Sequence, residues 1–192
     1  MPSLSPVALL PEVTVPLNRF VPPGYEHYFN GQPDRPYYLR RRFDFVGLPM
    51  MMPLVRAFLD TCAAEHDREF RYLFTLLGNE LASNAIKHSR SGQSGGTYSL
   101  IVRRHPDGLT LTCRDEGDPD PDSRWNQRQH TPHLHADPTG LDPTAEAGRG
   151  LALINALASS WGDNAHPALR QVWFHLTDIS RTTDLPTTEP TM

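Results

Sequence analysis

The stretch Leu77-Gly-Asn-Glu80-Leu-Ala-Ser-Asn84-Ala-Ile-Lys87-His88 decides the fold of this 192-residue chain. On a helix, where successive residues are about 100° apart, Glu80, Asn84 and Lys87 fall within an arc of about 60°. Apolar residues lie beside that arc: Phe74, Leu77, Leu81 and Ala85. Polar groups at the edge of a core need partners, because burying them unpaired is costly. A nucleotide with its metal ion would supply those partners, whereas a solvent-facing polar helix is the simpler alternative.

The composition limits the classes of protein. The length suits one domain with a hydrophobic core. No apolar run approaches the roughly 18 residues of a membrane span, and the first residues lack the pattern of a secretory signal. Cys62 and Cys113 sit far apart in apolar contexts. They predict two buried thiols in a reducing cytoplasm, with a disulfide as the alternative. The net charge of −4 argues against direct binding to nucleic acid.

The order of patterns predicts one domain over residues 37–177 between a Pro-rich extended arm (1–36) and a disordered tail (178–192). Helical spacing of apolar residues covers 48–64, 67–88 and 151–158. Strands are expected at 38–46, 97–104, 109–115, 161–162 and 171–176, with a hairpin turn at 105–108 and a flexible breaker at 89–96. This order favours an α+β fold: a two-layer α/β sandwich with a mixed sheet and helices on one face.

Residues 116–147 are polar, rich in Pro, Asp and His, and show no period. A loop of this length inside a compact domain is usually a lid, a binding loop or a disordered segment, and we expect a lid. His130, His133 and His135 within it do not have an established zinc spacing, and no cysteine is close. A solvated lid segment is therefore expected there rather than a metal site.

Two short motifs suggest ligand contacts. Asp115-Glu-Gly117 follows a strand, where a carboxylate can meet a ligand edge and a glycine lets the ligand approach the backbone. Gly148-Arg149-Gly150 opens a helix, whose free N–H groups and dipole attract anions such as phosphate. For each motif a ligand-free reading also stands: a surface turn for the first, and a glycine-rich helix entry for the second.

The order of these motifs resembles the Bergerat-fold (GHKL-type) ATP-binding module. The E-x3-N helix, the later D-x-G and the G-x-G before a helix look like its N, G1 and G2 boxes. Trp161-Gly162 together with Val172-Trp-Phe narrows the resemblance to the anti-sigma-factor branch, the small histidine-kinase-like serine kinases of bacterial partner switching. The resemblance covers roughly residues 38–176.

The resemblance implies ATP and Mg²⁺ as cofactors and assigns roles to the residues of the E-x3-N and D-x-G motifs. Asn84 would ligate Mg²⁺ bridging the phosphates, and Asp115 would accept a hydrogen bond from the adenine amino group. Gly117 would let the base approach the chain. Glu80 would be the general base that takes a proton from a serine hydroxyl of a protein substrate.

The G-x-G motif would bind the phosphates. By the same resemblance, Gly148, Arg149 and Gly150 would hold the phosphates and hinge the lid, with Lys87 as a weaker candidate for a phosphate contact. His88 is expected to pack against or cap the helix end rather than to act in catalysis.

Three features depart from the family pattern. Asp118-Pro119 stands where many relatives have a second glycine, and Gln171 stands where a threonine commonly supports the adenine-binding Asp. The loop from Asp118 to Ala147 is unusually long and polar. These departures bear on the shape of the adenine pocket and on lid closure.

Three functions are compared. The first is a serine kinase that phosphorylates an anti-sigma-factor antagonist and otherwise sequesters a sigma factor; homodimer formation, common among relatives, is left open. The second is a nucleotide-gated adaptor that binds a partner without transferring phosphate. The third, the catalytic part of a sensor histidine kinase, is disfavoured, because no membrane segment or long dimerisation helix with a phospho-acceptor His precedes the domain.

Overall fold

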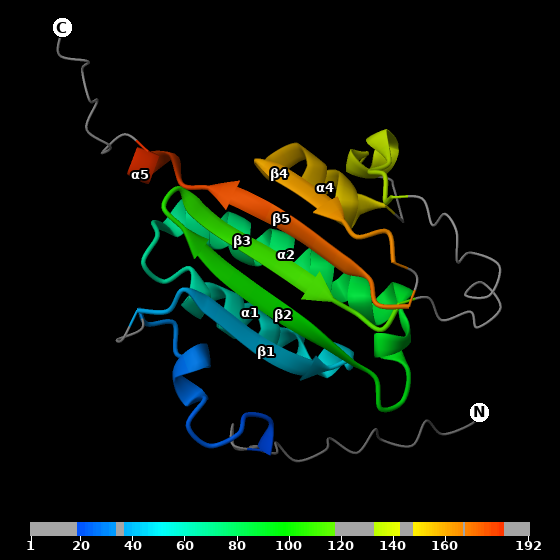
Figure 1. Cartoon of the computed structure of the whole chain (residues 1–192), viewed down its shortest axis with the longest axis horizontal. Helices are drawn as coiled ribbons and strands as arrows, with labels where there is room; N and C mark the ends of the chain where they lie inside the picture. Colours follow the sequence, from blue (N-terminus) through cyan, green and yellow to red (C-terminus); the bar gives the residue numbers. More distant parts are fainter. Residues whose placement is uncertain (1–18, 34–36, 118–132, 143–147, 167, 183–192) are drawn as a thin grey trace, which may run out of the picture.

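The computed structural model describes residues 19–33, 37–117, 133–142, 148–166 and 168–182. A five-stranded sheet has the order β1 (Arg40–Val46), β2 (Thr97–His105), β3 (Gly108–Arg114), β5 (Gln171–Thr177) and β4 (Ser160–Asp163). Helices α1 (Met52–Cys62), α2 (Arg68–His88) and α4 (Arg149–Leu157) lie behind it in Figure 1. The predicted α+β fold with helices on one face is confirmed.

The sheet is not mixed as predicted, because all four pairings among the described strands are antiparallel. The reason lies in the helical connections. Val46 at the end of β1 lies opposite Thr97 at the start of β2. The intervening α1 and α2 run away from this edge and back again, so the chain enters β2 in the opposite direction. α4 and β4 form a similar out-and-back connection between β3 and β5, since Arg114 lies opposite Gln171.

Helix α2 packs closely against both the sheet and helix α1. Its apolar face is buried at Phe74, Leu77 and Leu81. At Gly78 a Cβ atom would lie 2.7 Å from a Leu59 side-chain carbon of α1 and 2.9 Å from Leu111 of β3. Glycine at this position therefore sets the depth at which α2 approaches both neighbours.

Part of the predicted arm packs against the domain. Residues Glu26–Phe29 form the short 3₁₀ helix η2 within the arm that was predicted to be extended, and Val21 is buried. The Phe29 ring lies 5.0 Å from that of Phe43 on β1. The N–H of Gly31 donates to Thr61 of α1 at 2.8 Å. Residues 19–33 thus cover the outer side of β1 and α1 (Figure 1), whereas residues 1–18 lie outside the described chain.

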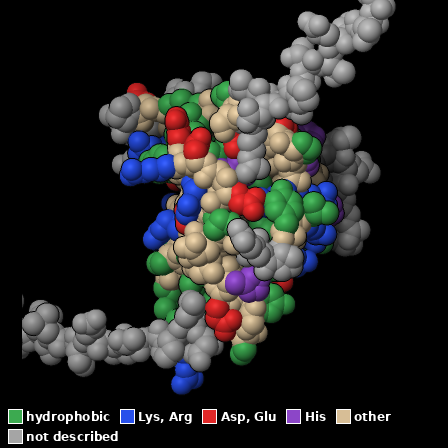
Figure 2. Space-filling model, turned by 90° about the vertical axis from the view of Figure 1, so that its left-hand side faces the viewer, with side chains coloured by type: hydrophobic (Ala, Val, Ile, Leu, Met, Phe, Trp, Pro, Cys, Tyr) green, Lys and Arg blue, Asp and Glu red, His purple; other side chains and the backbone are tan. Residues whose placement is uncertain are grey.

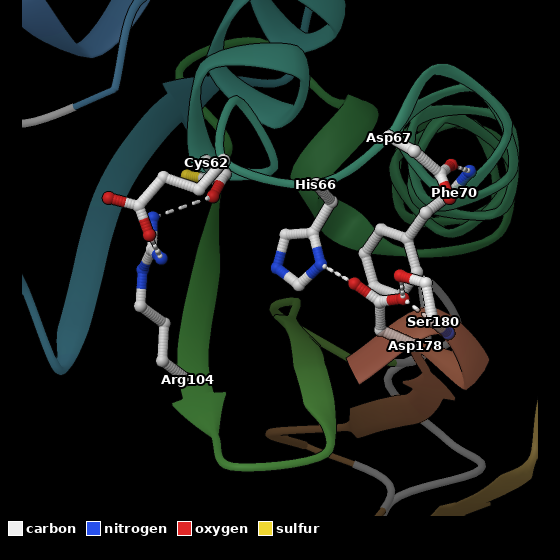
Figure 3. Close-up of polar contacts among 8 residues, drawn as sticks. Cys62, His66, Asp67, Phe70, Arg104, Asp178 and Ser180 are labelled. Atoms are coloured by element: carbon white, nitrogen blue, oxygen red, sulfur yellow. Dashed lines mark hydrogen bonds and ion pairs between the residues drawn. The ribbon is translucent and has the colours of Figure 1, made fainter. Parts of the chain in front are cut away.

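The start of the predicted tail is also folded. Asp178 follows β5 and is buried, with its Oδ2 2.6 Å from Nδ1 of His66 in the loop between α1 and α2 (Figure 3). Residues Ile179–Thr182 form the short helix α5. This end of the molecule, seen in Figure 2, carries acidic, basic and apolar side chains intermixed. No helix in the described ranges is long and apolar enough to cross a membrane.

An N-cap holds the beginning of α2. Oδ1 of Asp67 accepts a hydrogen bond from the N–H of Phe70 at 2.8 Å (Figure 3). We expect Asp67→Ala to lower the free energy of unfolding by about 1 kcal/mol, because this N–H then loses its partner. Denaturant unfolding followed by circular dichroism measures the change. Glu69→Gln, on the exposed side of the same turn, is the control, and equal stability of the two variants would contradict the capping role.

Candidate functional site

A cavity of about 270 Å³ lies between the sheet and the helices α2 and α4. Its apolar wall consists of Leu81 and Ala85 of α2, Leu151 of α4, Cys113 of β3 and Val172 of β5. Its polar lining consists of Asn84, His88, Asp115 and Arg170, with Gly117, Gly148 and Gly150 beside them. All three predicted motifs therefore contribute residues to one cavity.

Gly150 brings α4 against the polar stripe of α2. A Cβ atom at this position would lie 2.9 Å from Oε2 of Glu80 and 3.2 Å from Nδ2 of Asn84. No larger residue would fit unless these side chains moved. Gly148 is the N-cap residue of α4; its φ of +79° is left-handed, and as a glycine it supplies no side-chain cap. The first N–H groups of α4 therefore adjoin a carboxylate and an amide.

Asp115 forms the floor of the cavity and is only 8% exposed. Its Oδ1 accepts a hydrogen bond from the N–H of Gly117 at 2.7 Å, in a turn where Gly117 has a φ of +73°. Burial raises the pKa of Asp115 above its ordinary value, although the Gly117 N–H and the charge of Arg170 act in the opposite direction. A buried carboxylate with its second oxygen available is a hydrogen-bond acceptor suited to an amino group.

The turn after α2 supports this floor, and the sequence analysis missed it. Residues Arg90–Gly92 form the 3₁₀ helix η4, not the flexible breaker that was predicted. Nε of Arg90 donates to the carbonyl of Glu116 at 3.0 Å, and its backbone N–H donates to the carbonyl of Gly117 at 2.9 Å. The N–H of Glu116 in turn donates to Oγ of Ser91 at 3.0 Å. The only sequence signal was the residue after the helix, Ser89, whose hydroxyl caps the turn.

Part of the predicted lid has fixed structure. Nδ1 of His133 lies 2.8 Å from Oδ1 of Asp163 at the end of β4, and Leu134 lines the cavity. Burial alone would raise the pKa of Asp163, but hydrogen bonds from His133 and two backbone N–H groups lower it overall. Residues Pro138–Leu141 form the 3₁₀ helix η5. Among the described residues no group of three or more potential metal ligands occurs, and His130 lies outside the described residues.

Other predicted site residues lie elsewhere. Lys87 and Arg149 are exposed and do not line the cavity, whereas His88 at the end of α2 does. Gln171 does not support Asp115, because its register partner is Arg114, the residue before. Alternation along the strand places Gln171 on the open face of the sheet and Arg170 beside Asp115. Position 118, where a second glycine is common in relatives, is not described.

The residues present fit an adenine nucleotide with a divalent cation. The cavity is slightly smaller than the roughly 300 Å³ at the lower end of ligand pockets. It therefore suits the base, whose amino group would face Asp115. The phosphates would lie toward the N-terminus of α4, where uncapped N–H groups attract anions. Asn84 supplies an oxygen atom of the kind that Mg²⁺ prefers.

Comparison with known proteins agrees with this geometry. A family model described as the histidine kinase-like ATPase domain matches residues 46–175, which include every residue that lines the cavity. No curated protein matches the chain.

Gly150 provides a direct test of the site. We expect Gly150→Ala to keep the fold, because the nearest atom is the mobile end of Glu80. The same change should weaken binding of Mg²⁺–ATP about tenfold, since the methyl group displaces Glu80 and Asn84 from the start of α4. Calorimetry measures the affinity and circular dichroism the fold. Ala156→Ser, on the exposed side of α4, is the control; full affinity in Gly150→Ala would refute this arrangement.

Proposed function

The chain belongs to the histidine kinase-like ATPase family, and we propose that it is a protein-serine kinase of the anti-sigma-factor type that uses ATP and Mg²⁺. The observation that carries this proposal is the position of Glu80. Its carboxylate lies one helical turn from Asn84 and next to Gly150. Glu80 does not itself line the cavity, but Gly150 does, and Gly150 belongs to the first turn of α4, where the phosphates would lie. ATP binding follows from the family; phosphoryl transfer to a protein is the step proposed here.

The proposed chemistry assigns one task to each group. Asp115 and the apolar wall hold the base, and the N-terminus of α4 holds the phosphates. Bound Mg²⁺ would neutralise phosphate charge, with Asn84 as a ligand. Glu80 orients a serine hydroxyl of the partner and accepts its proton as the oxygen attacks the terminal phosphorus; the bond to the ADP oxygen breaks. Phosphoserine and ADP are the products.

The proposed partners are an anti-sigma-factor antagonist, which receives the phosphate, and a sigma factor, which the protein holds otherwise. Both rest on the likeness to the anti-sigma-factor branch through Trp161-Gly162 and Val172-Trp-Phe. The structure adds that the Trp161 side chain donates to Asn155 of α4 at 3.0 Å. This hydrogen bond joins β4 to α4, the helix whose N-terminus would hold the phosphates.

Glu80→Gln separates catalysis from binding. We expect it to bind Mg²⁺–ATP within about threefold of the wild type but to transfer phosphate to candidate antagonist proteins at least about a hundredfold more slowly, because an amide cannot accept the proton. Transfer is measured with ATP labelled at the γ-phosphate.

Glu69→Gln, a neutralised glutamate at the far end of α2, is the control and should transfer phosphate normally. Full transfer by Glu80→Gln would remove the assigned base. A wild-type protein that binds ATP and releases a partner on binding, yet transfers no phosphate, would instead indicate the nucleotide-gated adaptor.

A further inference from the structure

Arg170 lies directly across from Asp115 where β3 and β5 begin to separate. The ladder pairs Arg114 with Gln171, and one step further the N–H of Asp115 donates to the carbonyl of Arg170 at 3.0 Å. Side chains alternate between the two faces of a sheet. Asp115 and Arg170 therefore point to the same inner face as Cys113 and Val172, and all four line the cavity.

The guanidinium of Arg170 is held close to the cavity with hydrogen-bonding capacity left over. Its Nε is buried and has no hydrogen-bond partner among the described residues. A buried N–H donor without a partner is costly. Two negative or polar groups can offset that cost at this place: the carboxylate of Asp115 and a ligand in the cavity.

We propose that Arg170 is a positioning residue for adenine recognition, which presents its positive charge to the Asp115 carboxylate on the same inner face of the sheet. This inference rests on the nucleotide site proposed above. Arg170 is not among the residues that the family motifs select. The family pattern has a supporting threonine at the next position, where this chain has Gln171.

The charge state of Asp115 matters because only a carboxylate accepts hydrogen bonds through both oxygens. One oxygen already binds the N–H of Gly117, so the other must accept from adenine. A protonated Asp115 would present a hydroxyl donor against an amino donor. Loss of the proton is therefore a condition for adenine binding.

Several groups around Asp115 act on its pKa. Burial raises it most; the Gly117 N–H and the charge of Arg170 lower it, and Glu116 raises it. Cys113 on β3 faces the same cavity and has a pKa well above normal, so it stays neutral. His88 at the end of α2 also lines the cavity. Of the groups that shift the pKa of Asp115, Arg170 alone brings a positive charge.

Replacing the charge of Arg170 should shift the pKa of Asp115 in a defined direction. In Arg170→Gln a lowering influence is removed, so the pKa of Asp115 rises further. Adenine binding is then lost at a higher pH as the solution is acidified. Arg170→Lys keeps the charge and should restore most of the wild-type behaviour. Arg114→Gln is the matched control, because Arg114 is adjacent to Asp115 in sequence but lies on the other face of the sheet.

The first measurement is independent of nucleotide. Carboxyl carbon resonances of the ¹³C-Asp-labelled protein are followed against pH, and the signal missing in Asp115→Asn identifies Asp115. We expect its titration midpoint to move to higher pH in Arg170→Gln and to stay near the wild-type value in Arg170→Lys and Arg114→Gln. A midpoint that does not move in Arg170→Gln would overturn the proposal.

The second measurement uses ADP and purine riboside diphosphate, which lacks the 6-amino group, in calorimetry from neutral to acidic pH. We expect Arg170→Gln to weaken ADP binding about tenfold, increasingly so toward acid pH, and to change binding of the analogue little. Equal losses for both ligands would show a merely structural role and overturn the proposal. If the wild type binds neither ligand, the nucleotide site itself fails, whatever the titration of Asp115 shows.

Discussion

The close approach of α4 to α2 at Gly150 is the constraint on which the site depends. With no side chain at this position, the uncapped N-terminus of α4 meets Glu80 and Asn84 directly. The apolar side of α4, buried at Ala152 and Ile154, keeps the helix on the core. Anion-attracting N–H groups and metal-preferring oxygen atoms therefore occur side by side without a dedicated phosphate loop.

The sheet supplies the other half of the cavity, and the two halves have different chemistry. Around Asp115 the walls are apolar and the carboxylate is buried, which suits the flat base. Arg90, just after α2, donates hydrogen bonds to the turn that follows Asp115. The floor of the cavity is therefore held against the end of the helix that carries Glu80 and Asn84. One rigid helix thus sets the distance between the base and the phosphates.

Local patterns predicted most of the elements, because helix periodicity and hairpin turns are encoded by neighbours in sequence. They could not give the antiparallel sheet, the packing of residues 19–33 or the turn at Arg90, which depend on contacts between distant segments. Helical spacing placed Lys87 on the same arc as Asn84, but it could not reveal how α2 is tilted on the sheet. In the structure Lys87 is exposed. The strand register also differs by one residue from the expectation, so Arg170 and not Gln171 lies beside Asp115. A shift of one residue moves a side chain to the other face of the sheet.

Residues from α2, β3 and α4 together form the site that we assign to an adenine nucleotide with its metal ion. Calorimetric titration of wild type and Asp115→Asn with ATP, with and without Mg²⁺, tests this assignment most directly. We expect Mg²⁺-dependent binding to the wild type and a loss of about tenfold or more in the variant, where an amide donor faces the adenine amino group. Equally tight binding by both proteins, or no binding by the wild type, would contradict it.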